Sequence, residues 1–201
     1  LLQSSAASDV YKRQIFINDI LYSNSKLVME IRENGLPELS ILNLITKELN
    51  HVEFDDNAYD VSLSYNDELD GKTFNYYYSS LTKPPRIIAY DLVDNSKDIL
   101  WTKEIVSFNQ NNYKDSRFFI ESRDGTQVPV ITIAHKSTEL STAPILFYGY
   151  GSYGINIDAS FRSSLIPMLD RGFIFSIINI RGGGEMGKHW YEDGRMNKKL
   201  N

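Results

Sequence analysis

The segment FYGYGSYG, residues 147–154, combines glycines, hydroxyl groups and a preceding apolar run, and three kinds of chemistry are possible there. Residues 149–154 match G-x-G-x-x-G, the pattern that presents backbone amides to a pyrophosphate. That mechanism needs a helix at the third glycine, but residues 155–158, INID, favour a helix poorly. Arg181, after the next apolar run, would suit a 2′-phosphate. An NADP-binding oxidoreductase module therefore stays an alternative.

Ser152 is the candidate for a second kind of chemistry, nucleophilic attack. A nucleophile elbow needs glycine two residues before and two residues after the serine, because the backbone must turn sharply there. Tyr150 occupies the first of these places, and no other serine in the sequence lies in G-x-S-x-G. We therefore predict that these 201 residues contain no acyl-transfer nucleophile. The third possibility is that a tyrosine hydroxyl of this segment donates a hydrogen bond.

The elements that precede this segment are predicted to be β-strands. From residue 15 to residue 106, short runs rich in β-branched and aromatic side chains alternate with turn residues, and helical periodicity is nearly absent. This spacing favours a sandwich, a barrel or propeller blades. Turns are expected at residues 34–35, 67–71 and 94–97. Strands are expected over residues 27–31, 39–44, 60–65, 73–79, 86–91 and 99–104.

The pattern changes after residues 107–116, a polar, Asn-rich stretch that we interpret as a linker. Beyond it we expect a hairpin of strands 118–122 and 128–135 around Asp124-Gly125, and a strand over 145–148. A helix follows, with Ser164 as its N-cap, Pro167 in its first turn and Gly172 at its end. The apolar run 173–180 is typical of a strand buried in a parallel sheet, so the second half predicts an α/β sheet. We expect one side of this last strand to lack a neighbour.

Composition narrows the function classes further. A hydrophobic content of 42% indicates a packed protein, and a net charge of −5 with scattered Lys and Arg makes nucleic acid an unexpected partner. The chain has no cysteine, which favours a reducing compartment, and we expect the cytoplasm. No apolar run approaches the roughly 20 residues that span a bilayer.

Residues 1–14 differ in composition from the rest of the chain and are interpreted as a non-native, adaptor-like segment.

No metal or cofactor is expected. The three histidines have no metal-ligand spacing between them, and His189 beside Trp190 is interpreted as structural.

Five motifs in one order carry a resemblance to a known family: SRDGTQVPV, PILFYGYGSYG, LDRGF, IRGGGEMGKHWYEDGR and NKK. Together they resemble the start of the α/β-hydrolase domain of the prolyl oligopeptidase family. Upstream, SSLTKPPRIIAYDL is similar to the last blade of that family's β-propeller, and GYGSYG with WYEDGR resembles the oligopeptidase B branch. The resemblance implies propeller blades over residues 15–106, a linker over 107–116, and a peptidase domain that starts at 117 and is cut off before its nucleophile.

The resemblance also implies a function and site residues. The whole protein would hydrolyse oligopeptides as a serine peptidase, after Lys or Arg if it follows the oligopeptidase B branch. Its Ser, Asp and His would lie outside this chain, which would be inactive alone. In the family the second tyrosine of Y-G-Y-G donates its hydroxyl to the oxyanion, which places that role on Tyr150. Arg181 and Glu185 are expected to support the site, paired with each other.

Two alternatives stay open at this point. Tyr148 and Tyr150 could be strand-end aromatics packed on the core. The whole protein could also be a member that keeps the fold, lacks activity and works through binding.

Overall fold

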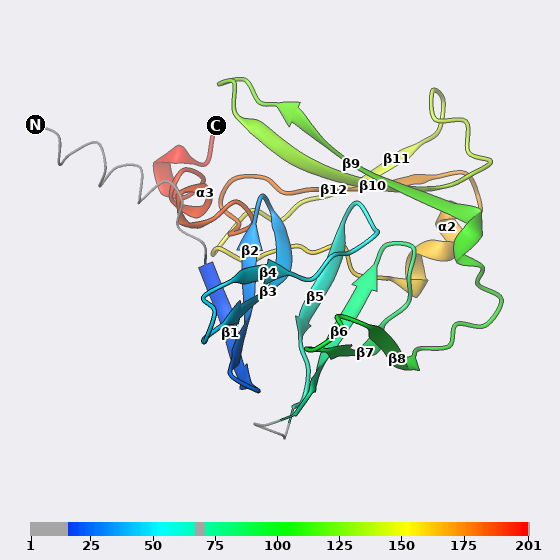
Figure 1. Cartoon of the computed structure of the whole chain (residues 1–201). Coiled ribbons are helices and arrows are strands. Elements are labelled where there is room, and N and C mark those ends of the chain that lie inside the picture. The colour runs from blue at the N-terminus through cyan, green and yellow to red at the C-terminus, as the bar shows by residue number, and fades with distance from the viewer. Residues whose placement is uncertain (1–15, 67–70, 201) are drawn as a thin grey trace, which may run out of the picture.

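The computed structural model describes residues 16–66 and 71–200, and it contains three four-stranded sheets (Figure 1). The adaptor-like segment 1–14 and most of the turn predicted at 67–71 lie outside the described residues. In Figure 1 the sheet formed by the second half of the chain runs across one end of two smaller sheets formed by the first half. The change of pattern near residue 107 therefore coincides with a change of sheet.

The first sheet is an antiparallel meander in the order β1-β2-β3-β4. Asn34 and Gly35 join β2 to β3 at φ +51° and +83°, which is the left-handed backbone that the Asn-Gly pair predicts for a two-residue hairpin turn. Neither β1 nor β4 was predicted, because polar residues interrupt the first and the second has three exposed residues. The strands are β1 (Phe16–Ser23), β2 (Lys26–Glu33), β3 (Leu36–Asn43) and β4 (Leu49–His51).

The second sheet repeats the meander in the order β5-β6-β7-β8. All six strands predicted for the first half are present. Side chains of both sheets form one core, in which Val28, Leu39, Phe74 and Tyr76 are at most 1% exposed. Two such meanders packed side by side are the arrangement of successive propeller blades. The strands are β5 (Tyr59–Leu63), β6 (Thr73–Ser80), β7 (Arg86–Asp91) and β8 (Lys97–Thr102).

The third sheet has the order β11-β12-β10-β9, and it is mixed. β9 and β10 form the predicted hairpin, β12 runs antiparallel to β10, and β12 runs parallel to β11. The expectation that one side of the last strand lacks a neighbour is wrong, because β12 inserts between β10 and β11. The strands are β9 (Tyr113–Glu121), β10 (Gln127–His135), β11 (Ile145–Tyr148) and β12 (Ile174–Ile178).

Short helices connect and follow these strands. The helix predicted after Ser164 begins as a 3₁₀ turn whose N-cap is Arg162, so Ser164 lies inside the turn, and Gly172 ends the segment at φ +86°. β9 begins at Tyr113, inside the stretch interpreted as a linker. None of the helices in the described part of the chain is long and apolar enough to cross a membrane. The helices are η1 (Gln110–Asn112), η2 (Ser163–Leu165), α2 (Ile166–Leu169), α3 (Lys188–Glu192) and η3 (Met196–Lys198).

A second core lies between α2 and the third sheet. Ile131 and Ile133 of β10 and Phe175 and Ile177 of β12 pack there against Leu169, and each is at most 2% exposed. β12 is thus fixed from both sides and from one face. The loops at the carboxyl ends of β11 and β12 start from this rigid base.

Candidate functional site

Residues 149–154, here called the Tyr150 loop, leave the carboxyl end of β11. Gly151 has φ +60°, and a Cβ at this residue would clash with the side chain of Ile180 and lie 2.9 Å from the carbonyl oxygen of Arg181. Glycine is therefore needed for this close approach. At the far end of the loop, the Gly154 amide donates to the Gly182 carbonyl oxygen at 3.0 Å. The Tyr150 loop is held directly against residues 181–185, here called the glycine loop.

Tyr150 presents its side chain at the surface of this loop. It is 43% exposed, and Tyr148 at the end of β11 is 39% exposed, with the Arg162 guanidinium 4.8 Å from its ring centroid. The Tyr148 ring lies 6.4 Å, centroid to centroid, from Phe175 of the second core. A phenol on a fixed backbone can donate one hydrogen bond to an acceptor that comes to the loop.

The G-x-G-x-x-G match does not form a dinucleotide site. Residues 155–162 after the third glycine form no helix, and η2 begins only at Ser163. The pyrophosphate mechanism needs a helix N-terminus directly after the glycines. Arg181, the residue suggested for a 2′-phosphate, is bound elsewhere. The structure therefore contradicts the condition on which the NADP-binding alternative depended.

Arg181 fixes the glycine loop to the turn of the β9–β10 hairpin. Its Nη1 lies 2.5 Å from Oδ2 of Asp124 and 3.2 Å from Oγ1 of Thr126, and its Nη2 lies 3.4 Å from Oγ of Ser122. The hydrogen bond from Arg181 holds the pKa of the Asp124 carboxyl well below its usual range. The expected pair between Arg181 and Glu185 is wrong, since each side chain has other partners.

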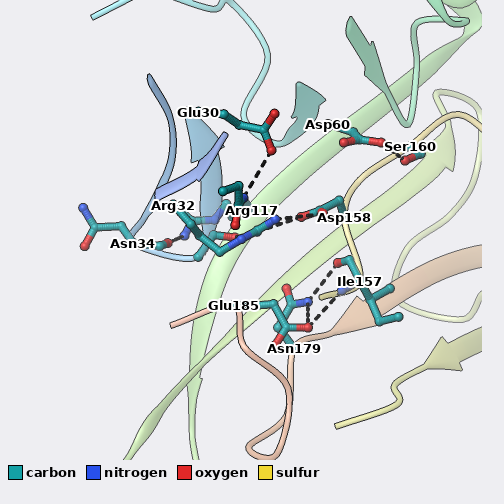
Figure 2. A network of polar contacts seen from close by, with 12 residues as sticks. Glu30, Arg32, Asn34, Asp60, Arg117, Ile157, Asp158, Ser160, Asn179 and Glu185 are labelled. Atoms are coloured by element: carbon teal, nitrogen blue, oxygen red, sulfur yellow. Dashed lines mark hydrogen bonds and ion pairs between the residues drawn. The ribbon is translucent and has the colours of Figure 1, made fainter. Parts of the chain in front are cut away.

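Glu185 points into the interior from the other end of the glycine loop, and it is 2% exposed (Figure 2). Its Oε1 accepts hydrogen bonds from the Ile157 amide at 3.0 Å and from Nδ2 of Asn179 at 3.1 Å. Asn179 also donates to the Ile157 carbonyl oxygen at 3.0 Å, and its own carbonyl oxygen accepts from Nε1 of Trp190. Arg181 and Glu185 diverge because the glycines between them turn the backbone.

Asn179 was not singled out from the sequence, although a signal exists. It ends the apolar run FIFSIIN, and a polar residue at a buried position must find hydrogen-bond partners. Asn179 is 2% exposed, and its side-chain amide donates two hydrogen bonds. A polar side chain at the end of a predicted buried strand would have identified it.

Burial raises the pKa of Glu185, which makes stability depend on pH at this residue. A raised native pKa means that the folded state binds the proton more tightly, so the unfolding free energy falls as pH rises from the unfolded value through the native value. Glu185→Gln removes this titration and keeps an acceptor for Ile157. We expect the variant to gain stability relative to the wild type as pH rises through that window. Urea unfolding between about pH 4 and about pH 8 measures this difference.

Glu192→Gln, at the half-exposed end of α3, is the matched control for the loss of one carboxylate. A stability difference between Glu185→Gln and wild type that stays constant with pH would contradict the prediction.

Cavities lie beside these loops and over the third sheet. One of about 500 Å³ adjoins both loops and is lined by Gly154 and Gly184 together with Arg32, Asn156 and Tyr191. A second one of about 620 Å³ is formed over the face of the third sheet, with apolar side chains such as Phe118, Ile145 and Phe147 in its wall. Another of about 360 Å³ adjoins the Tyr150 loop and is lined by Ser152, Tyr153 and residues 182–199 in part. Within residues 16–66 and 71–200, no group of three or more His, Cys, Asp or Glu side chains could hold a metal ion.

Comparison with known proteins identifies both parts of the chain. The profile described as "Prolyl oligopeptidase, N-terminal beta-propeller domain" matches residues 11–103, and the profile described as "Prolyl oligopeptidase family" matches residues 159–201. Among curated relatives, Protease 2 of Moraxella lacunata is 28% identical over 193 residues, and Dipeptidyl aminopeptidase BI of Pseudoxanthomonas mexicana is 30% identical over 193 residues. Each match covers 95% of this chain, but only 28% and 27% of the relative.

Solved structures agree with this assignment. Oligopeptidase B from Trypanosoma brucei with covalently bound antipain superimposes with a TM-score of 0.82 at 30% identity, over 91% of this chain and 27% of that one. Oligopeptidase B from Leishmania major gives a TM-score of 0.79 at 31% identity, over 90% of this chain and 27% of that one. The predicted order, the end of a β-propeller followed by the start of the peptidase domain, is confirmed. The chain therefore belongs to the prolyl oligopeptidase family, and it spans a little over a quarter of the length of these relatives.

Proposed function

We propose that this chain supplies the oxyanion-binding loop of a serine-type oligopeptidase, with Tyr150 as the hydroxyl donor. The exposed phenol of Tyr150, on a loop that glycine contacts hold against residues 181–185, is the observation that carries this proposal. When a serine Oγ attacks a peptide carbonyl, negative charge develops on the carbonyl oxygen, and a fixed donor stabilises it. Arg181 and Glu185 support the site by holding the glycine loop, without a covalent role.

The nucleophilic serine and its aspartate and histidine are proposed to belong to the rest of the whole protein. Its proposed substrates are oligopeptides. Cleavage after Lys or Arg is proposed from the resemblance of GYGSYG and WYEDGR to the oligopeptidase B branch. No cofactor, metal or nucleic acid takes part in the proposed reaction.

The domain limits and the location are proposed as well. Residues 15–106 are assigned to propeller blades, 107–116 to a linker, and 117–201 to the first part of an α/β-hydrolase domain, which the parallel pair of β11 and β12 supports. The absence of cysteine from the chain supports a reducing compartment, and we propose the cytoplasm.

A fluorophosphonate probe, which labels activated serines, tests the function. We expect the whole protein to be labelled at one serine and to cleave fluorogenic peptides with Lys or Arg before the scissile bond. The 201-residue chain alone is expected to remain unlabelled. Labelling of this chain would overturn the assignment, and a folded whole protein that is neither labelled nor active would favour the binding-only alternative.

A further inference from the structure

Residues 155–162, here called the strap, connect the Tyr150 loop to η2 and carry an ion pair to the first blade. Asp158 accepts two hydrogen bonds from Arg32 of β2, at 2.8 Å from Nη1 and 2.9 Å from Nη2 (Figure 2). The Arg32 side chain is 6% exposed and that of Asp158 is 21% exposed. A two-point contact of this kind fixes the direction of both groups as well as their distance.

The second blade binds the same strap three residues further on. The Phe161 amide donates to Oγ of Ser79, at 3.0 Å, and the Ser160 hydroxyl donates to the Asp60 carboxylate. Ser79 belongs to β6 and is fully buried. Both blades therefore hold one four-residue stretch that begins only eight residues after Tyr150.

The strap is also bound to the glycine loop. The Ile157 amide, one residue before Asp158, donates to the buried carboxylate of Glu185. The glycine loop in turn contacts the Tyr150 loop, through the bond from Gly154 to Gly182. A continuous series of short contacts thus runs from Arg32 through Asp158, Ile157 and Glu185 to the backbone around Tyr150.

We propose that Arg32 and Asp158 are positioning residues, through which the propeller blades hold the Tyr150 loop in the geometry that stabilises the oxyanion. This inference rests on the role proposed above for Tyr150. Arg32 binds the Asp158 carboxylate with both of its Nη atoms. It acts on the strap, and the strap acts on the loop through Glu185. The pair is expected to influence the chemical step more than substrate binding.

The variants Arg32→Met, Asp158→Asn and the double variant test the pair. In the whole protein we expect each single variant to lower kcat roughly tenfold, with KM within about twofold of wild type, because the oxyanion donor moves while the binding surface stays. The double variant should lose no more than the worse single variant, since the two side chains act as one contact. Glu38→Gln, which removes the charge that pairs with His51 between β3 and β4 of the first blade, is the control and should leave kcat unchanged.

Amide hydrogen exchange gives a readout that does not depend on activity. Arg117 still binds the Asn34 carbonyl oxygen, so Arg32→Met leaves the first blade attached to β9. We expect exchange in residues 149–157 and 181–185 of the variant to be about tenfold faster than in wild type. Unchanged exchange in these residues, or an unchanged kcat, would overturn the positioning role. A different result would separate the two proposals. If Tyr150→Phe leaves kcat intact while Arg32→Met still speeds exchange in these residues, the function proposed for Tyr150 is wrong, but the contact from the first blade to the loop is supported.

Discussion

Tyr150→Phe in the whole protein is expected to lower kcat by about 10²-fold to 10³-fold, which corresponds to roughly 2.7–4 kcal/mol of lost transition-state stabilisation. The substitution removes one hydroxyl and keeps the ring. The hydroxyl is needed only when charge develops on the carbonyl oxygen, so KM should change little. Steady-state kinetics with a fluorogenic peptide measures both constants.

Tyr153→Phe is the matched control for this prediction. Tyr153 lies in the same loop and is 82% exposed, so its side chain contributes little to packing in the described chain. We expect kcat, KM and the unfolding free energy of this variant to stay near wild type. A kcat for Tyr150→Phe that matches the control would exclude Tyr150 as the oxyanion donor, and a large shift in melting temperature would indicate a structural role instead.

Local sequence patterns predicted the elements well. Runs rich in β-branched and aromatic side chains, separated by turn residues such as Asn34-Gly35, located six of the eight strands of the two blades, because each pattern reports on neighbours a few residues apart. Tyr150 lies in the loop after β11, where the sequence places it. Its role remains a prediction, since the structure shows its exposure and not its chemistry.

Spatial order and long-range partners could not be predicted in the same way. The local sequence pattern is the same whether β12 lies at the edge of the sheet or between β10 and β11. The prediction that one side of β12 lacks a neighbour was therefore wrong. The bond between Arg32 and Asp158 joins residues 126 positions apart. Arg181 and Glu185 are close in sequence, yet the glycines between them send one to the hairpin turn and the other to the interior.

Gly182 is a position where a single methyl group is expected to disrupt the fold of the site. Its φ of +103° is strained for any residue with a side chain, and a Cβ would clash with the Gly151 carbonyl oxygen and lie 2.9 Å from that of Gly194. Both neighbours are backbone atoms, so no side chain can rotate away. The Tyr150 loop itself must move to accommodate the methyl group.

Gly182→Ala should therefore lose stability for two reasons, backbone strain and overpacking, and a second variant can separate them. Gly172 has φ +86°, but a Cβ added to it would meet no atom within 4 Å, so Gly172→Ala carries the backbone strain alone. We expect about 1 kcal/mol for Gly172→Ala, and roughly 3 kcal/mol or more for Gly182→Ala, where overpacking adds to the strain. Urea unfolding of both variants measures the difference. Equal losses would show that the two loops are not in rigid contact, and the support proposed for Tyr150 would then have no structural basis.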